Sequence, residues 1–289
     1  MFQKICSGEG FGKVLGEGVR RAAESVGKEA QAVEEETRIL PYGPKVFTPS
    51  ALLYAVEPWP LISSLHEMRK ILTKWFKWYA SAGKESYLST DVLRGIGEKF
   101  WGSAKAADFS TDEGKALAAV KNQNRQYVKE SLILCDFIWP VYEDVSSAEY
   151  VGDPTIESRL LSAVTGEEID EAGLEARGEK IFTVNRAILL RDGKEGRGDD
   201  TLPDTQFMER EEMIADGFGM HNPELVLPGQ GGQIISRKGK ALERGKFELL
   251  KDEYYRLRGW DVSTGLLKRE SLREMGLTDL IEPLGRKAT

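Results

Sequence analysis

Very few side chains in this chain could act as nucleophiles or soft metal ligands, because its 289 residues include two cysteines and two histidines. Cys135 lies in the stretch YVKESLILCDFIWP, five residues after Glu130. A thiol in such a stretch is a buried hydrophobe, a nucleophile or a metal ligand. A nucleophile needs a base or a positive charge beside it, and no spacing pairs His66 or His221 with Cys135. No CxxC, CxxxC or HExxH pattern occurs, so the residues alone favour a buried thiol.

The helical spacing around Cys135 supports the same interpretation. If one helix runs from Ser110 to Pro140, Cys135 lies above Leu117 on the apolar stripe of that helix. Glu130 and Cys135 then point about 140° apart, so the two side chains cannot both face one ligand. Either a ligand lies across the end of the helix, after a break near Pro140, or only one of the two residues contacts it.

The composition indicates an acidic globular protein rather than a nucleic-acid-binding, secreted or membrane protein. The formal charge is −7 and the pI is about 5.2, whereas a general nucleic-acid binder needs a basic surface. Two cysteines make no disulfide framework, and no secretory signal is visible, which favours a reducing cytoplasm. The longest apolar run, LILCDFIWPV, is too short to span a bilayer. We therefore expect a cytoplasmic chain with no nucleic-acid partner and no membrane span.

Apolar residues recur at three- and four-residue steps along most of the chain, which predicts a mainly α fold with little strand. Capping boxes are predicted at Ser110 with Glu113 and at Thr165 with Glu168, where a hydroxyl and a carboxylate satisfy free amides. The predicted helices cover residues 11–26, 61–83, 110–139, 169–188, 246–259 and 268–277.

Proline and glycine mark the segments between these helices. Five prolines make residues 38–60 an irregular connecting segment, and glycines among charged residues make 190–205 a loop. In that loop the acidic pair Asp199–Asp200 either contacts a cofactor or partner, or orders the backbone of a turn. Residues 230–239 are predicted to form a short strand or a lid-like loop.

Three segments, in the same order along the chain, resemble the tungsten-containing aldehyde ferredoxin oxidoreductase family. They are GFGKVLGEGVRRAAESVGKEA, EKIFTVNRAILLRDGKEGRGDDTLPDTQF and LKDEYYRLRGWDVSTGLLKRESLREMGL. DDTLP and YYRLRGWD together are specific to this family, whereas either alone is weak. The stretch from AVEP to LHE is more similar to the branch that contains the class II benzoyl-CoA reductases. The resemblance implies multi-helix C-terminal domains of the aldehyde ferredoxin oxidoreductase type.

The resemblance also implies cofactors and site residues. Family members hold a tungsten, rarely molybdenum, bis-pterin cofactor beside a 4Fe-4S cluster, and oxidise or reduce an aldehyde or related carbonyl or acyl substrate. Electrons pass to ferredoxin or another carrier. ESLILC matches the family's D-S-L-G-L-C-like motif, which implies a pterin contact at Glu130 and Leu134 and the fourth cluster thiolate at Cys135. Glu130 replaces aspartate and Ile133 replaces glycine in that motif.

His66 is similar in position to a family histidine near the metal, which implies a catalytic proton relay. The alternative is a histidine at the margin of the helix 61–83, next to a core leucine. Cys6 matches no family ligand and is expected in the core.

The resemblance further implies an incomplete set of domains. Residues 1–57 correspond to the end of the second, helical, pterin-side domain with its connecting segment, and 58–289 to the third domain. The family's N-terminal β-rich domain, and the C-x-x-C-x-x-x-C group that supplies three cluster thiolates, are absent from this sequence. One thiolate cannot hold a cluster that needs four.

We therefore expect the C-terminal part of a tungstopterin, iron-sulfur oxidoreductase that is inactive without the missing half, present as a partner subunit. An exposed apolar face along the first helix would support this hypothesis. The alternatives are a truncated product without activity, or a non-catalytic helical module that binds a protein partner and keeps Cys135 in its core.

Overall fold

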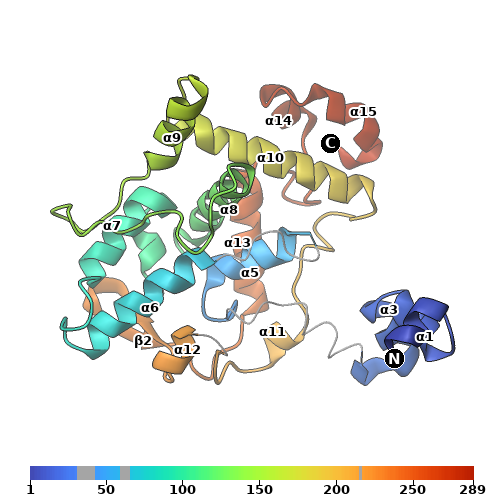
Figure 1. Ribbon diagram of the computed structural model, residues 1–289, viewed down its shortest axis with the longest axis horizontal. Helices are drawn as coiled ribbons and strands as arrows, with labels where there is room; N and C mark the ends of the chain where they lie inside the picture. Colours follow the sequence, from blue (N-terminus) through green and yellow to red (C-terminus); the bar gives the residue numbers. More distant parts are fainter. Residues whose placement is uncertain (31–42, 59–65, 215–216) are drawn as a thin grey trace. The chain divides into compact units, whose positions relative to one another are not determined.

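Regular structure in the chain is mainly helical, as predicted. The computed structural model describes residues 1–30, 43–58, 66–214 and 217–289. Figure 1 shows the helices in chain order, coloured from blue at the N-terminus to red at the C-terminus. Within the described ranges no helix is long and apolar enough to cross a membrane. The α-helices described are α1 (Phe2–Ser7), α2 (Phe11–Gly16), α3 (Val19–Val26), α5 (Thr48–Val56), α6 (His66–Ala80), α7 (Thr90–Trp101), α8 (Lys115–Ser131), α9 (Ile156–Thr165), α10 (Glu171–Arg191), α11 (Thr205–Met208), α12 (Gly217–His221), α13 (Arg244–Leu257), α14 (Arg269–Glu274) and α15 (Ile281–Leu284).

The strand content is small, also as predicted. β1 (Val226–Pro228) pairs with β2 (Ile234–Ser236) in an antiparallel hairpin, with Val226 opposite Ser236. β2 falls within residues 230–239, so the strand is the correct one of the two structures predicted there.

The chain forms two compact units. Unit 1 contains Met1–Leu40 with Pro203–Thr205, and unit 2 contains Pro41–Leu202 with Gln206–Thr289. The candidate residues Glu130, Leu134 and Cys135 belong to unit 2. The domain boundary at residue 57, taken from the family resemblance, stays a prediction.

Unit 1 corrects the single helix predicted over 11–26. The helix is interrupted between α2 and α3 because Gly18 has φ +106° and ψ 160°, a conformation that suits glycine but not a helix. Cys6, expected in the core, is exposed. Val19 and Val26 of α3 are exposed as well, whereas Ala22 on the same predicted apolar face is buried.

Helix α8 is the centre of unit 2, where it contacts α5, α7, α10 and α13 (Figure 1). Alanines at 116, 118 and 119 are buried and let the neighbouring helices approach closely. Helix α10 approaches closely at Gly178, where a Cβ atom would stand 2.2 Å from the carbonyl oxygen of Asn124. Glycine is therefore required where α10 crosses α8.

The connecting segment predicted over 38–60 contains a helix, so this prediction is wrong in part. Helix α5 is buried along its whole length and packs on α8 and α13. Pro49 lies in the first turn, where a backbone N–H would make no hydrogen bond within the helix, so proline is tolerated there. Pro58 follows the end of the helix. The two prolines delimit a helix of nine residues instead of preventing it.

Both predicted capping boxes are wrong. Ser110 donates to the carboxylate of Asp108 at 2.6 Å, and α8 begins only at Lys115. Thr165 is the last residue of α9 rather than a residue before a helix. The N-cap of α10 is Asp170, whose carboxylate accepts a hydrogen bond from the Gly173 amide at 2.8 Å.

The helices predicted over 61–83, 246–259 and 268–277 correspond to α6, α13 and α14. The start of the first lies outside the described residues, which resume at His66. Leu72 and Trp75 are fully buried on the predicted apolar face of α6. The sequence pattern predicted neither α7 nor α9.

Candidate functional site at the end of helix α8

Helix α8 ends at Ser131, so the helix predicted to continue to Pro140 is too long. The amide of Leu134 donates to the carbonyl of Lys129 at 2.9 Å, which closes the last turn. Ile133 has φ +57°, the left-handed conformation that ends many helices and that usually belongs to glycine. Ile133 is also the position where the family motif has glycine. Glycine would adopt this conformation without the strain that a Cβ atom adds.

Two substitutions at Ile133 test whether this residue is left-handed in solution. The side chain is 91% exposed, so its removal costs little packing. A Cβ atom in the left-handed region costs about 1–2 kcal/mol. We expect Ile133→Gly to be more stable than Ile133→Ala by about 1 kcal/mol in denaturant unfolding. The opposite order would mean that residue 133 is not left-handed in solution.

Cys135 is exposed on the loop after α8, so the buried thiol favoured by the residues alone is wrong. The carbonyl of Cys135 accepts hydrogen bonds from the amides of Ile138 at 3.0 Å and Trp139 at 2.9 Å, which fold the loop into a turn. Phe137 and Ile138 on this turn are 63% and 64% exposed. The thiol therefore lies within an exposed apolar surface.

Two lysines fix this loop and place positive charge near the thiol. The ammonium of the buried Lys129 donates to Asp136 at 2.6 Å and to the carbonyl of Trp139 at 3.3 Å. Lys70 of α6 donates to the carbonyl of Phe137. Burial lowers the pKa of Lys70, whereas the neighbouring Asp136 and Cys135 act to raise it.

Glu130 and Leu134 flank the end of α8. Glu130 is exposed in the last turn, and its carboxylate accepts a hydrogen bond from Gln126 at 2.9 Å. Leu134 is half-buried. The 140° separation expected between Glu130 and Cys135 does not apply, because the helix ends between them. The end of α8 carries both residues.

His66 is the first residue of α6, and its side chain lies outside the described part of the structure. Its backbone stands one helical turn before Lys70, which contacts the Cys135 loop. The structure thus brings the beginning of α6 toward the loop, and the role of His66 stays a prediction.

The described residues supply one thiolate for a metal centre at this site. In the described ranges no group of three or more histidine, cysteine or acidic side chains could hold a metal ion. A 4Fe-4S cluster takes four thiolates, so Cys135 fits such a cluster as one ligand of four.

Glu57 lies in a buried network that sequence analysis missed. Its carboxylate accepts hydrogen bonds from Gln123 at 2.5 Å and from the Tyr127 hydroxyl at 3.0 Å, and Asn185 donates to that hydroxyl at 2.7 Å. Burial raises the pKa of Glu57 to about 7, although both hydrogen bonds and the charge of Arg258 act to lower it. An acid directly after the apolar run LLYAV is the signal that could have indicated it. Such a carboxyl group exchanges protons near neutral pH.

The motifs that carry the family resemblance meet at a buried ion pair. Arg186 donates two hydrogen bonds of 2.7 Å to Asp200 and one of 2.9 Å to the carbonyl of Gly265. The Tyr255 hydroxyl also donates to Asp200, and the Arg186 guanidinium lies 4.5 Å from the centre of the Trp260 ring. Burial acts to raise the pKa of Asp200, but the charges of Arg186 and Lys194 and the hydrogen bonds from Arg186 and Tyr255 together outweigh burial and hold that pKa below its usual range. Asp200 thus joins segments of the fold, which the sequence did not predict. Asp199 accepts a hydrogen bond from the Glu195 amide and orders the turn backbone, as one of the two predictions for the acidic pair expected.

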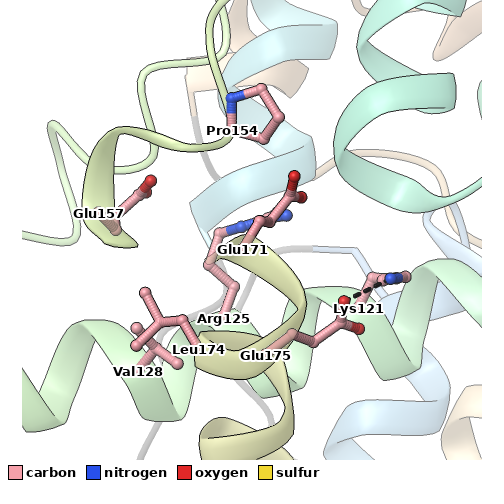
Figure 2. A pocket seen from close by; sticks show the side chains of 8 residues that line it. All are labelled: Lys121, Arg125, Val128, Pro154, Glu157, Glu171, Leu174 and Glu175. Carbon is pink, nitrogen blue, oxygen red and sulfur yellow. Dashed lines mark hydrogen bonds and ion pairs between the residues drawn. The ribbon is translucent and has the colours of Figure 1, made fainter. Parts of the chain in front are cut away.

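A crevice between α8 and α10 carries charged side chains but is too small for a substrate (Figure 2). Its volume is about 30 Å³, which is the space of one or two water molecules. Figure 2 shows Lys121 paired with Glu175 across it. The lining residues are Lys121, Arg125, Val128, Pro154, Glu157, Glu171, Leu174 and Glu175.

Comparison with known proteins agrees with the resemblance found in the sequence. The family model described as "Aldehyde ferredoxin oxidoreductase, domains 2 & 3" matches residues 1–277. The fold is similar to a chain in the solved active site complex BamBC of benzoyl coenzyme A reductase with 1,5-dienoyl-CoA, at a TM-score of 0.54 and 15% identity. The match covers 99% of this chain and 39% of that chain, so this chain spans less than half of that length.

Proposed function

The chain belongs to the aldehyde ferredoxin oxidoreductase family, and from this premise we propose that it forms the C-terminal part of a tungstopterin, iron-sulfur oxidoreductase. Its reaction is a two-electron oxidation or reduction of an aldehyde or a related carbonyl or acyl substrate, with ferredoxin or a similar protein as electron carrier. The bound cofactors supply the redox chemistry. The residues of this chain bind them and manage charge and protons around them.

The exposed Cys135 is the observation that carries this proposal. A buried structural thiol would have no route to a metal, whereas this thiol lies on a loop that Lys70 and Lys129 hold in place. In the proposed function Cys135 is the fourth thiolate of a 4Fe-4S cluster. The two ammonium groups offset part of the negative charge of a thiolate-bound cluster, which is one of the factors that set its reduction potential.

Glu130 and Leu134 are proposed to contact a pterin of the cofactor. An exposed carboxylate accepts hydrogen bonds from pterin N–H groups, and Glu130 has one oxygen engaged by Gln126 and capacity for further donors. The half-buried Leu134 offers apolar contact beside it. His66 is proposed as a proton relay, because an imidazole changes its charge near neutral pH.

The remaining three thiolates are proposed to come from a polypeptide segment outside this sequence or from a partner subunit. Exposed apolar side chains support a covering partner at two places, with Phe137 and Ile138 beside Cys135, and Val19 and Val26 on α3. A partner that covers the Cys135 loop would also exclude water from the cluster.

Metal content tests this proposal. The chain is produced anaerobically with tungstate and iron, alone and together with a polypeptide that carries C-x-x-C-x-x-x-C. We expect about four irons per chain, with tungsten, only in the joint preparation. Cys135→Ala should lose the iron, because one of the four cluster ligands is gone.

Cys6→Ala is the matched control, since Cys6 is the other exposed cysteine and is not a proposed ligand. This variant should keep the iron. Iron retained in Cys135→Ala would overturn the ligand assignment. Folded protein without metal in either preparation would favour the second candidate, a non-catalytic helical module, which the exposed apolar loop at Phe137 and Ile138 also supports as a protein-binding surface.

A further inference from the structure

A pocket of about 470 Å³ lies in unit 2, within the usual range for small-molecule sites. Its walls come from the turn before α5, the segment before α8, β2 with the turn that follows, and the first turns of α13. The pocket adjoins the beginning of α8, whereas Cys135 follows the end of that helix. The 17 residues of α8 span about 25 Å, so the pocket and the Cys135 loop lie at opposite ends of α8.

Lys45 is the residue that points to a ligand. Its side chain lines the pocket and only 7% of the residue is exposed. In the described part of the chain the Lys45 ammonium has no hydrogen-bond acceptor and no ion-pair partner. The stem of Lys45 is covered by protein, and its unpaired ammonium gives the pocket a positive charge that attracts anions. An anion in the pocket would supply a counter-charge.

The other charged groups of the pocket make it a site for negative charge. Arg237, Lys240 and Lys246 also line it, opposed by the acids Asp112 and Glu243. Glu243 is already paired with Lys246 at 2.7 Å, and Arg237 donates to the carbonyl of Phe109 at 3.0 Å. Together with Lys45 the four cations exceed the two carboxylates by two charges.

The N-terminus of α5 adds to this positive potential. Thr48, the first residue of the nine-residue α5, lines the pocket, so the positive end of that helix dipole lies at the pocket wall. The lining also includes the apolar side chains of Phe109, Ile235, Phe247 and Leu250. A ligand that matches both the charged and the apolar side chains carries a compact anion and an apolar or aromatic part.

We infer that this pocket binds a phosphorylated small molecule, with its phosphate beside Lys45 and Arg237 and its apolar part against Ile235 and Leu250. A phosphate monoester carries up to two negative charges, which equals the excess of positive charge in the pocket. Its several oxygens suit donors that converge from different elements.

Titration calorimetry on the full chain tests this inference, with adenosine monophosphate, inorganic phosphate and adenosine as probes. Adenosine monophosphate should bind most tightly, because it alone matches both the charged and the apolar side chains of the pocket. Lys45→Met keeps the apolar stem and removes the charge, and should weaken this binding about 10- to 100-fold. Lys84→Met, which removes one exposed charge outside the pocket, should bind as the unaltered chain does.

Three results would overturn the inference. Adenosine binding as tightly as adenosine monophosphate would show that the phosphate is not recognised. Inorganic phosphate binding as tightly would show that the apolar side chains are not used. Unchanged affinity of Lys45→Met for adenosine monophosphate would show that Lys45 does not bind the phosphate. Should Lys45→Met fail to fold, Lys240→Met takes its place, since this exposed lysine also lines the pocket and a several-fold loss is expected there.

Discussion

Asp200→Ala is expected to lower the free energy of unfolding by about 3–5 kcal/mol. Asp200 and Arg186 are both fully buried, and the two hydrogen bonds between them are 2.7 Å long. Lys194 also lies 2.9 Å from the carboxylate, and the hydroxyl of Tyr255 donates to it. Removing the carboxylate leaves the Arg186 guanidinium buried without its counter-charge, and most of the expected loss is the cost of that unpaired charge.

Asp199→Ala is the matched control for this prediction. Asp199 is the adjacent acid in the same loop, but it is exposed and accepts a hydrogen bond only from the Glu195 amide in the described structure. Its replacement should cost about 1 kcal/mol or less. Denaturant unfolding of both variants measures the difference. Equal losses in the two variants would mean that the acidic pair acts through the loop backbone and that the buried ion pair contributes little.

The second large effect is a dependence of stability on pH that comes from Glu57. Its pKa is about 7 in the folded chain, against an ordinary value of 4.5, because burial disfavours the carboxylate. Between these two pH values the folded chain holds a proton that the unfolded chain has lost. The contribution of Glu57 to stability is therefore fully present below about pH 4.5, and it falls by up to about 1.4 kcal/mol per pH unit until pH reaches about 7.

Glu57→Gln should remove this pH dependence while keeping one carbonyl acceptor for Gln123 or Tyr127. Unfolding free energies at pH 5 and pH 7.5 would be measured for both chains. The unaltered chain should lose more stability between these pH values than Glu57→Gln does. Glu85→Gln, at an exposed acid, serves as control and should behave as the unaltered chain. If Glu57→Gln showed the same loss as the unaltered chain, Glu57 would be ionised throughout the pH range.

The sequence by itself determined the fold class, the family and several helices. The apolar periodicity of residues 246–259 and 268–277 predicts α13 and α14, because a helix that packs along one face repeats its apolar residues at that period. DDTLP and YYRLRGWD indicated the family before any geometry was known, and the family match over residues 1–277 confirms it. Each of these signals lies within a short segment of the chain, so it can be recognised without knowing the tertiary structure.

Tertiary structure decided where helices end and which charges are buried. Apolar residues continue past Ser131, but the left-handed Ile133 closes α8 and turns Cys135 outward. Five prolines suggested an irregular segment, yet burial against α8 and α13 stabilises the short helix α5 between two of them. An isolated helix of that length would be marginal in water, so its sequence alone does not predict it.

Neighbouring residues in the sequence also do not predict which charged groups are buried. Glu57 and Asp200 are acids of a kind usually found at the surface, yet both are buried. Their partners, Tyr127 and Arg186, become neighbours only when α5, α8 and α10 pack together. A charge enters a protein interior when long-range packing supplies its hydrogen bonds or counter-charge, and that condition depends on the assembled fold rather than on neighbouring residues.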